Sequence, residues 1–144
     1  MKNYHIFISN VPFNSTNLNN TINQSGVQNI YRSSTAGSPT TVGVNATGRY
    51  VRIQLAGQGF LGLTEVEVLG CGGSSGGGGG NNNCTSSSNI APNGTAKQSS
   101  TNFSANASNA IDGNREGNFW DAAKTVSITT VSYTHLTLPT ICSV

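Results

Sequence analysis

The sequence predicts an all-β protein made of antiparallel strands. Short segments carry apolar residues at every second position, as expected for strands with one buried face. Only 35% of the residues are hydrophobic and 8% are charged, and Gly, Asn, Ser and Thr take up much of the remainder. This composition suits short strands joined by many turns and suits long helices poorly.

Two strands are expected in the first 60 residues. The stretch "YHIFISNVPF" (residues 4–13) is predicted to form a strand that ends at Pro12, and "GRYVRIQL" (residues 48–55) a clearer one. In the second, one face carries Val51, Ile53 and Leu55, and the other carries Tyr50, Arg52 and Gln54.

A third strand is expected over "LGLTEVEVLG" (residues 61–70), after a turn at Gly57 and Gly59. Val66 and Val68 would face away from Glu65 and Glu67. The only stretch with any helical character is "NLNNTINQSGV" (residues 17–27), and its asparagine content argues against a helix.

The stretch "CGGSSGGGGGNNNC" (residues 71–84) divides the chain near its middle. Runs of glycine behave as random coil, and domain boundaries fall in such segments. We therefore expect a linker over residues 72–88. It separates a first segment, residues 1–71, from a second, residues 89–130.

The two segments carry a family resemblance. "GRYVRIQLAGQGFLGLTEVEVLG" (residues 48–70) resembles the closing strands of a discoidin domain, the factor V/VIII type C fold that includes fucolectins and family 32 carbohydrate-binding modules. "NIAPNGTAKQSSTNFSANASNAIDGNREGNFW" (residues 89–120) is similar to the opening of such a domain. The resemblance implies a discoidin-like, jelly-roll-like antiparallel β-sandwich present as two incomplete halves, a C-terminal half (1–71) followed by the N-terminal half of a second copy (89–130).

The resemblance also implies a structural calcium ion, because "NAIDGN" (residues 109–114) is similar to a calcium-binding loop of fucolectin-like domains. Carboxylates and main-chain oxygens would hold it, contributed by Asn109, Asp112, Asn114, Glu65, Thr64 and Ala123, the last through its carbonyl. The alternative is a plain Asp-Gly hairpin turn that needs no metal.

The order of the two halves is inverted, as in a circular permutation. A flexible linker over residues 72–88 spans roughly 23 Å root-mean-square, taking about 5–6 Å times the square root of the residue number. We therefore expect the 109–114 loop to approach the strand that carries Glu65, so that Glu65 and Asp112 face a common site.

The resemblance implies a non-catalytic, calcium-supported module of a secreted or cell-surface protein that binds carbohydrate or a surface glycan. The histidine of the family's sugar site falls on Val126, and its two basic positions would precede Met1. Aromatic residues are candidates for stacking on a sugar or for the core: Tyr4, Tyr31, Phe60, Phe119 and Trp120. The alternatives are a structural or adhesin repeat that binds protein or lipid, and an appendage of a secreted glycoside hydrolase.

Other function classes are not expected. The seven basic residues are scattered and form no stripe interleaved with aromatics, which argues against nucleic acid as a partner. No run approaches the roughly 18 apolar residues of a membrane helix, so no transmembrane segment is expected. His5 has no neighbouring Ser or Cys nucleophile in the sequence, and no glycosidase motif surrounds the five acids, so no enzyme is expected.

The end of the chain has a separate explanation. "TVSYTHLTLPT" (residues 130–140) resembles a translated sequencing adaptor over eleven consecutive residues. Residues 131–144 are then expected to make few buried contacts. The alternative is a genuine strand, since Val131, Tyr133 and His135 alternate with the residues between them.

The adaptor interpretation leaves two cysteines, Cys71 and Cys84, at the ends of the glycine-rich stretch. They would form a disulfide with each other in an exported protein, or they would be free or differently paired thiols, and both alternatives stay open. Zinc is not expected, because two isolated cysteines without a nearby histidine do not form a tetrahedral site.

Overall fold

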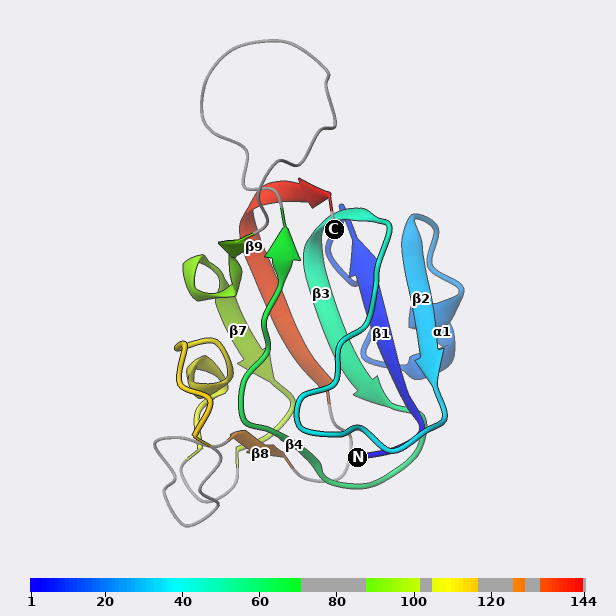
Figure 1. The fold of residues 1–144 in the computed structure, drawn as a ribbon. Coiled ribbons are helices and arrows are strands. Elements are labelled where there is room, and N and C mark those ends of the chain that lie inside the picture. The colour runs from blue at the N-terminus through cyan, green and yellow to red at the C-terminus, as the bar shows by residue number, and fades with distance from the viewer. Residues whose placement is uncertain (71–87, 102–104, 117–125, 129–132, 144) are drawn as a thin grey trace, which may run out of the picture.

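The computed structural model describes residues 1–70, 88–101, 105–116, 126–128 and 133–143. Its largest element is a five-stranded antiparallel sheet with the strand order β2-β1-β3-β9-β7 (Figure 1). The strands are β1 (Tyr4–Ser9), β2 (Val27–Arg32), β3 (Thr47–Leu55), β7 (Thr95–Gln98) and β9 (Tyr133–Ser143). The prediction of an all-β, antiparallel protein is confirmed.

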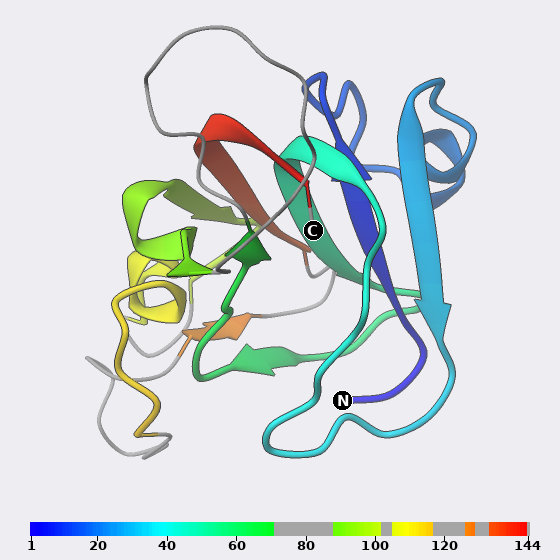
Figure 2. The same cartoon turned by 45° about the horizontal axis from the view of Figure 1, so that its top comes forward.

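A second layer covers one face of this sheet. It contains two antiparallel strand pairs, β4 (Leu61–Leu63) with β8 (Val126–Ile128) and β5 (Leu69–Gly70) with β6 (Ser88–Asn89). Two 3₁₀ helices complete it, η1 (Ala91–Asn93) and η2 (Ala107–Ala110). Figures 1 and 2 show the segment from β4 to β5 running in front of the sheet, with the α-helix α1 (Leu18–Ile22) behind β2.

β3 is covered on both of its faces, which explains its alternating sequence. Val51, Ile53 and Leu55 pack against the hydrophobic residues of the second layer. Arg52 and Gln54, on the opposite face, are 0% and 2% exposed and lie under the chain that follows β1. The expected division of β3 into two faces is therefore right, and its polar face is buried as well.

Residues from both segments of the chain form a common core. Val68 of the first segment packs with Ile90, Ala91 and Ile111 of the second, and all four are buried. A second cluster has the fully buried side chain of Leu61 at its centre. The segments on either side of the linker therefore share one hydrophobic core.

α1 corrects one expectation, because the asparagines were expected to prevent a helix there. The helix spans five residues, and the Asn17 side chain caps it by accepting a hydrogen bond from the Asn20 amide at 3.2 Å. Asparagine is unfavourable inside a helix and favourable at its N-cap, so its position decides its effect. The buried Thr21 then holds the helix against the sheet.

Arg52 fixes this helix to β3. Its Nη1 donates hydrogen bonds to the Ser15 carbonyl oxygen at 2.7 Å and to Thr21 Oγ1 at 2.9 Å. Its guanidinium carbon lies 4.3 Å from the centre of the Phe13 ring, within the range of a cation–π interaction. One buried charge thus binds the loop after β1, α1 and β3 together.

Replacing this arginine is expected to destabilise the protein strongly. Arg52→Met keeps much of the apolar stem but removes the hydrogen bonds of a buried charged group, which should lower the free energy of unfolding by about 3 kcal/mol. Urea denaturation measures the change. Arg115→Met is the matched control, because Arg115 is 75% exposed and its surface ion pair contributes only about 0–1 kcal/mol. Equal decreases in the free energy of unfolding of the two variants would contradict this role of Arg52.

Residues 131–144 were expected to make few buried contacts, but residues 133–143 form β9, which pairs with a strand on each side within the sheet. β9 pairs with β3 from Thr47↔Ser143 to Gln54↔Tyr133, and with β7 from Thr95↔Thr137 to Gln98↔Thr134. Strand pairing uses backbone groups, so an alternating segment can occupy the space between two open strand edges whatever its origin. The alternative of a genuine strand describes this part of the fold.

Truncation before Tyr133 is therefore expected to destabilise the protein. It opens the edges of both β3 and β7, and the melting temperature should fall by about 5–10 °C, as for a loss of a few kcal/mol. Differential scanning calorimetry measures this. A chain shortened only by Val144, which lies beyond β9, is the control. An unchanged melting temperature after the longer truncation would show that β9 contributes nothing to stability.

Candidate functional site

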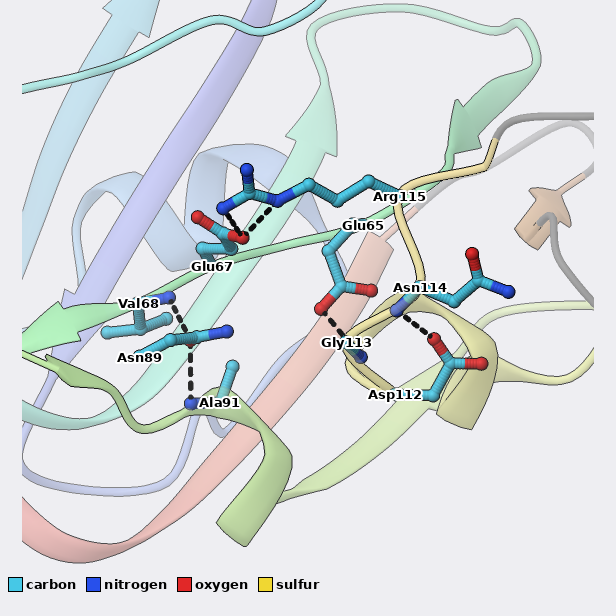
Figure 3. A network of polar contacts seen from close by, with 9 residues as sticks. All are labelled: Glu65, Glu67, Val68, Asn89, Ala91, Asp112, Gly113, Asn114 and Arg115. Atoms are coloured by element: carbon cyan, nitrogen blue, oxygen red, sulfur yellow. Dashed lines mark hydrogen bonds and ion pairs between the residues drawn. The ribbon is translucent and has the colours of Figure 1, made fainter.

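Residues 61–70 were expected to form one continuous strand, but the structure has two short strands, β4 and β5, with an irregular segment between them. The backbone of this segment forms hydrogen bonds with residues that are distant in the sequence. The Val66 amide donates to the Ala110 carbonyl at 2.7 Å, and the Ile90 amide donates to the Val68 carbonyl at 2.9 Å. The Asn89 side chain adds to this, because its Oδ1 accepts from the amides of both Val68 and Ala91 at 3.1 Å (Figure 3).

The alternation predicted for this segment is nevertheless present. Val66 and Val68 contact the core clusters, whereas Glu65 and Glu67 point toward the loop that follows η2 (Figure 3). Glu65 Oε1 accepts a hydrogen bond from the Gly113 amide at 3.2 Å. Glu67 forms an ion pair with Arg115, in which Nε donates to Oε1 at 2.6 Å. The 109–114 loop thus lies against the segment that carries Glu65, as expected from the sequence.

The loop itself is a sequence of side-chain-capped turns. Asp112 Oδ1 accepts from the Asn114 amide at 2.8 Å, and Asn114 Oδ1 accepts from the Glu116 amide at 3.0 Å. Gly113 has φ +83°, a conformation that glycine adopts without steric cost. The Asp112-Gly113 bend therefore follows a 3₁₀ helix and joins no two described strands, so it is not the hairpin turn of the non-metal alternative.

The electrostatic environment of Glu65 is unfavourable for its charge. Burial raises the pKa of this carboxyl above its usual value, and the nearby charges of Asp112 and Glu67 raise it further. The Gly113 amide and Arg115 act in the opposite direction and lower the pKa. The second carboxylate oxygen, Oε2, is buried and has no hydrogen-bond partner among the described residues.

These features fit a hard cation. Calcium prefers carboxylate and main-chain oxygens, and a cation beside Glu65 would offset both its burial and the repulsion from Asp112. Asn114 belongs to the turn whose Gly113 amide bonds Glu65, and Asn109 directly precedes Ala110, whose carbonyl accepts from the Val66 amide. Ala123 lies outside the described residues. Within the described part of the chain, no three His, Cys, Asp or Glu side chains gather into a metal-binding group, so main-chain oxygens would have to complete the coordination.

The other candidate residues are dispersed. Tyr4 is buried in the core, whereas Tyr31 and Phe60 are 51% and 69% exposed, so the core interpretation is wrong for these two. Phe119, Trp120, Cys71 and Cys84 lie outside the described residues, and only the backbone position of Val126, in β8, is described.

The contacts of His5 are those of a residue that packs inside the fold. It is buried, its ring stacks on Phe7 with centroids 5.4 Å apart, and its Nδ1 lies 2.7 Å from Asn29 Oδ1.

The sequence did not single out Asn89 or the Glu67–Arg115 pair. The only available signal was the opposite charge of Arg115, directly after the Asp-Gly-Asn turn.

Comparison with protein-family models, with curated proteins and with solved structures gives no match. Among the described residues, no helix has the length and apolar character needed to cross a membrane.

The raised pKa of Glu65 predicts a pH-dependent stability. A folded-state pKa above the usual value of 4.5 means that this group stabilises the fold below that value, and that the contribution is lost as pH rises through the folded-state pKa. In the presence of a chelator, Glu65→Gln should therefore match the wild type at low pH and become the more stable protein as pH approaches 7. Urea denaturation across this pH range measures the difference.

Glu116→Gln serves as the control, because it removes an exposed carboxylate from the same loop. Its stability relative to the wild type should show no such rise with pH. A Glu65→Gln variant that is less stable than the wild type at neutral pH without metal would contradict the electrostatic description.

Proposed function

We propose that this chain is a non-catalytic carbohydrate-binding module of the discoidin type, supported by calcium and belonging to a secreted or cell-surface protein. The observation that carries the proposal is the contact between the 109–114 loop and Glu65. In a discoidin-like domain the two chain ends lie together and contribute to one calcium site; in this chain the Gly113 amide of the second segment bonds Glu65 of the first, which supports the proposal.

The shared core supports the same proposal. Val68 packs with Ile90 and Ile111 across the linker, as expected if residues 1–71 and 89–130 are complementary halves of one sandwich. In this proposal the linker joins the original end of the domain to its original beginning. β9 lies between β3, from the first segment, and β7, from the second, and so joins the two in one sheet.

In this proposal calcium would be held by the carboxylates of Glu65 and Asp112, with main-chain oxygens of Thr64, Asn109 and Asn114 and of Ala123. When bound, the ion supplies positive charge that fixes the loop to the 64–68 segment. Two contacts within the chain also hold this region. The Gly113 amide orients Glu65, and the Glu67–Arg115 ion pair holds the far side of the loop.

A structural or adhesin repeat that binds protein or lipid is the second candidate. Phe60 is 69% exposed and Leu69 is 46% exposed, and exposed large apolar side chains favour such contacts. An appendage of a secreted glycoside hydrolase is compatible with the first proposal, because its catalytic part would be a separate domain.

A calcium titration followed by differential scanning fluorimetry tests the metal. A ligand at 100 times its dissociation constant stabilises a protein by about 2.7 kcal/mol, so the melting temperature should rise by several degrees. Glu65→Gln and Asp112→Asn should abolish this rise. Asp112→Asn keeps an oxygen for the Asn114 amide, so the turn is preserved, and Glu116→Gln is the control that should respond like the wild type.

The ligand class is tested by glycan-array binding with and without chelator. Glycan signals that disappear with chelator are expected. A blank glycan array together with binding to lipid vesicles or immobilised proteins would favour the second candidate. A melting temperature that does not respond to calcium would remove the metal from the proposal.

A further inference from the structure

A wide hollow lies on the α1 side of the sheet, between the loop after β1 and the turn after α1. Its volume is about 850 Å³, and it is open to solvent over much of its extent. We call it the amide hollow, and its lining residues are Val11, Pro12, Asn14, Ser15, Asn20, Asn23, Gln24 and Ser25. It is separate from the loop at Glu65, which belongs to the layer on the opposite face of the sheet.

The walls of the amide hollow are fixed by hydrogen bonds. The side chain of Gln24 bridges them, because its Oε1 accepts from the Asn14 amide at 3.0 Å and its Nε2 donates to the Pro12 carbonyl at 2.9 Å. Arg52 holds the Ser15 carbonyl and Thr21 from below. A site held in this way loses little conformational freedom when a ligand binds.

Several polar groups of the hollow retain hydrogen-bonding capacity. Asn23 uses its Nδ2 on the Asn19 carbonyl at 2.8 Å, and Asn20 uses its Nδ2 on Ser15 Oγ at 3.3 Å. Within the described residues, no hydrogen bond occupies the Oδ1 atoms of Asn20 and Asn23 or the side-chain amide of Asn14. These three asparagines are exposed.

The lining selects the chemistry of the ligand. It carries amides and hydroxyls, which both donate and accept, and none of its residues is charged. An anion such as phosphate would meet no cationic side chain there, and a cation would meet no carboxylate. Val11, which is 48% exposed, and Pro12 add an apolar surface. Hydroxyl groups beside a C–H face are the features of a neutral sugar ring.

We propose that the amide hollow is a binding site for a neutral saccharide, with Asn14, Asn20 and Asn23 hydrogen-bonding its hydroxyls and Val11 and Pro12 packing on its C–H face. This inference rests on the proposed carbohydrate-binding function and places a ligand site away from the calcium loop. Such a site needs no metal, since the groups that define it are held by Gln24 and Arg52.

The test is titration of the full chain with galactose, mannose and N-acetylglucosamine, followed by ¹H–¹⁵N NMR, with calcium and separately with chelator. Saturable shifts are expected at the amides of residues 14, 20 and 23–25 in both conditions. The double variant Asn14→Ala, Asn23→Ala should weaken binding by about tenfold or more, as for the loss of one or two hydrogen bonds. The control Asn45→Ala, Asn93→Ala removes two exposed amides outside the hollow and should bind like the wild type.

The outcomes separate this inference from the proposed function. Glycan binding that is unchanged in the double variant would overturn the hollow as a site and leave the carbohydrate-binding module standing. An absence of binding to these sugars and to every glycan on an array would overturn both. Shifts at the hollow with inorganic phosphate, and none with the neutral sugars, would overturn the assignment to a neutral ligand.

Discussion

The docking of residues 64–68 onto the second half of the chain is the constraint on which the remaining structure depends. Three backbone hydrogen bonds in this segment have partners in residues 88–111, and the Asn89 side chain provides one of them. Because these bonds hold the backbone, the alternating side chains have only one arrangement, with valines toward the core and glutamates toward the loop. The core and the candidate calcium site are therefore two consequences of a single contact.

The same constraint explains why the charged form of Glu65 is destabilised at the candidate site. Bringing Glu65 against the loop buries one carboxylate oxygen and places Asp112 and Glu67 nearby. Arg115 neutralises Glu67 at the surface, yet it only partly offsets the burial of Glu65. A fold that needed this contact for packing alone would be better served by an uncharged residue at position 65, which is a physical reason to look for a cation there.

The sequence predicted the features that depend on local alternation. The two faces of β3 and the opposed pairs Val66/Val68 and Glu65/Glu67 follow from a period of two, which burial on one face imposes directly. Prediction from the sequence failed where residues distant in the chain determine the local structure. The break between β4 and β5 depends on hydrogen bonds to Asn89 and Ala110, and nothing in residues 61–70 signals those partners.

Two further elements show the limits of propensity. α1 forms because Asn17 caps it and Thr21 is held by Arg52, a residue 31 positions away. β2 has no clear alternation and is placed by its pairing with β1, from Tyr4↔Arg32 to Ser9↔Val27. The amide hollow arises from both effects, since its walls are the α1 turn and the loop after β1. Its lining of scattered Asn and Ser residues looks like ordinary turn composition in the sequence.

For β9, the origin of the segment and its role in the sheet are independent questions. The adaptor interpretation concerns where residues 130–140 come from, whereas pairing with β3 and β7 depends on two open edges and a chain able to extend between them. A sheet with an open interior position accepts an alternating strand through its backbone, with little demand on the identity of the side chains. The resemblance to an adaptor and the position of β9 in the sheet are thus compatible.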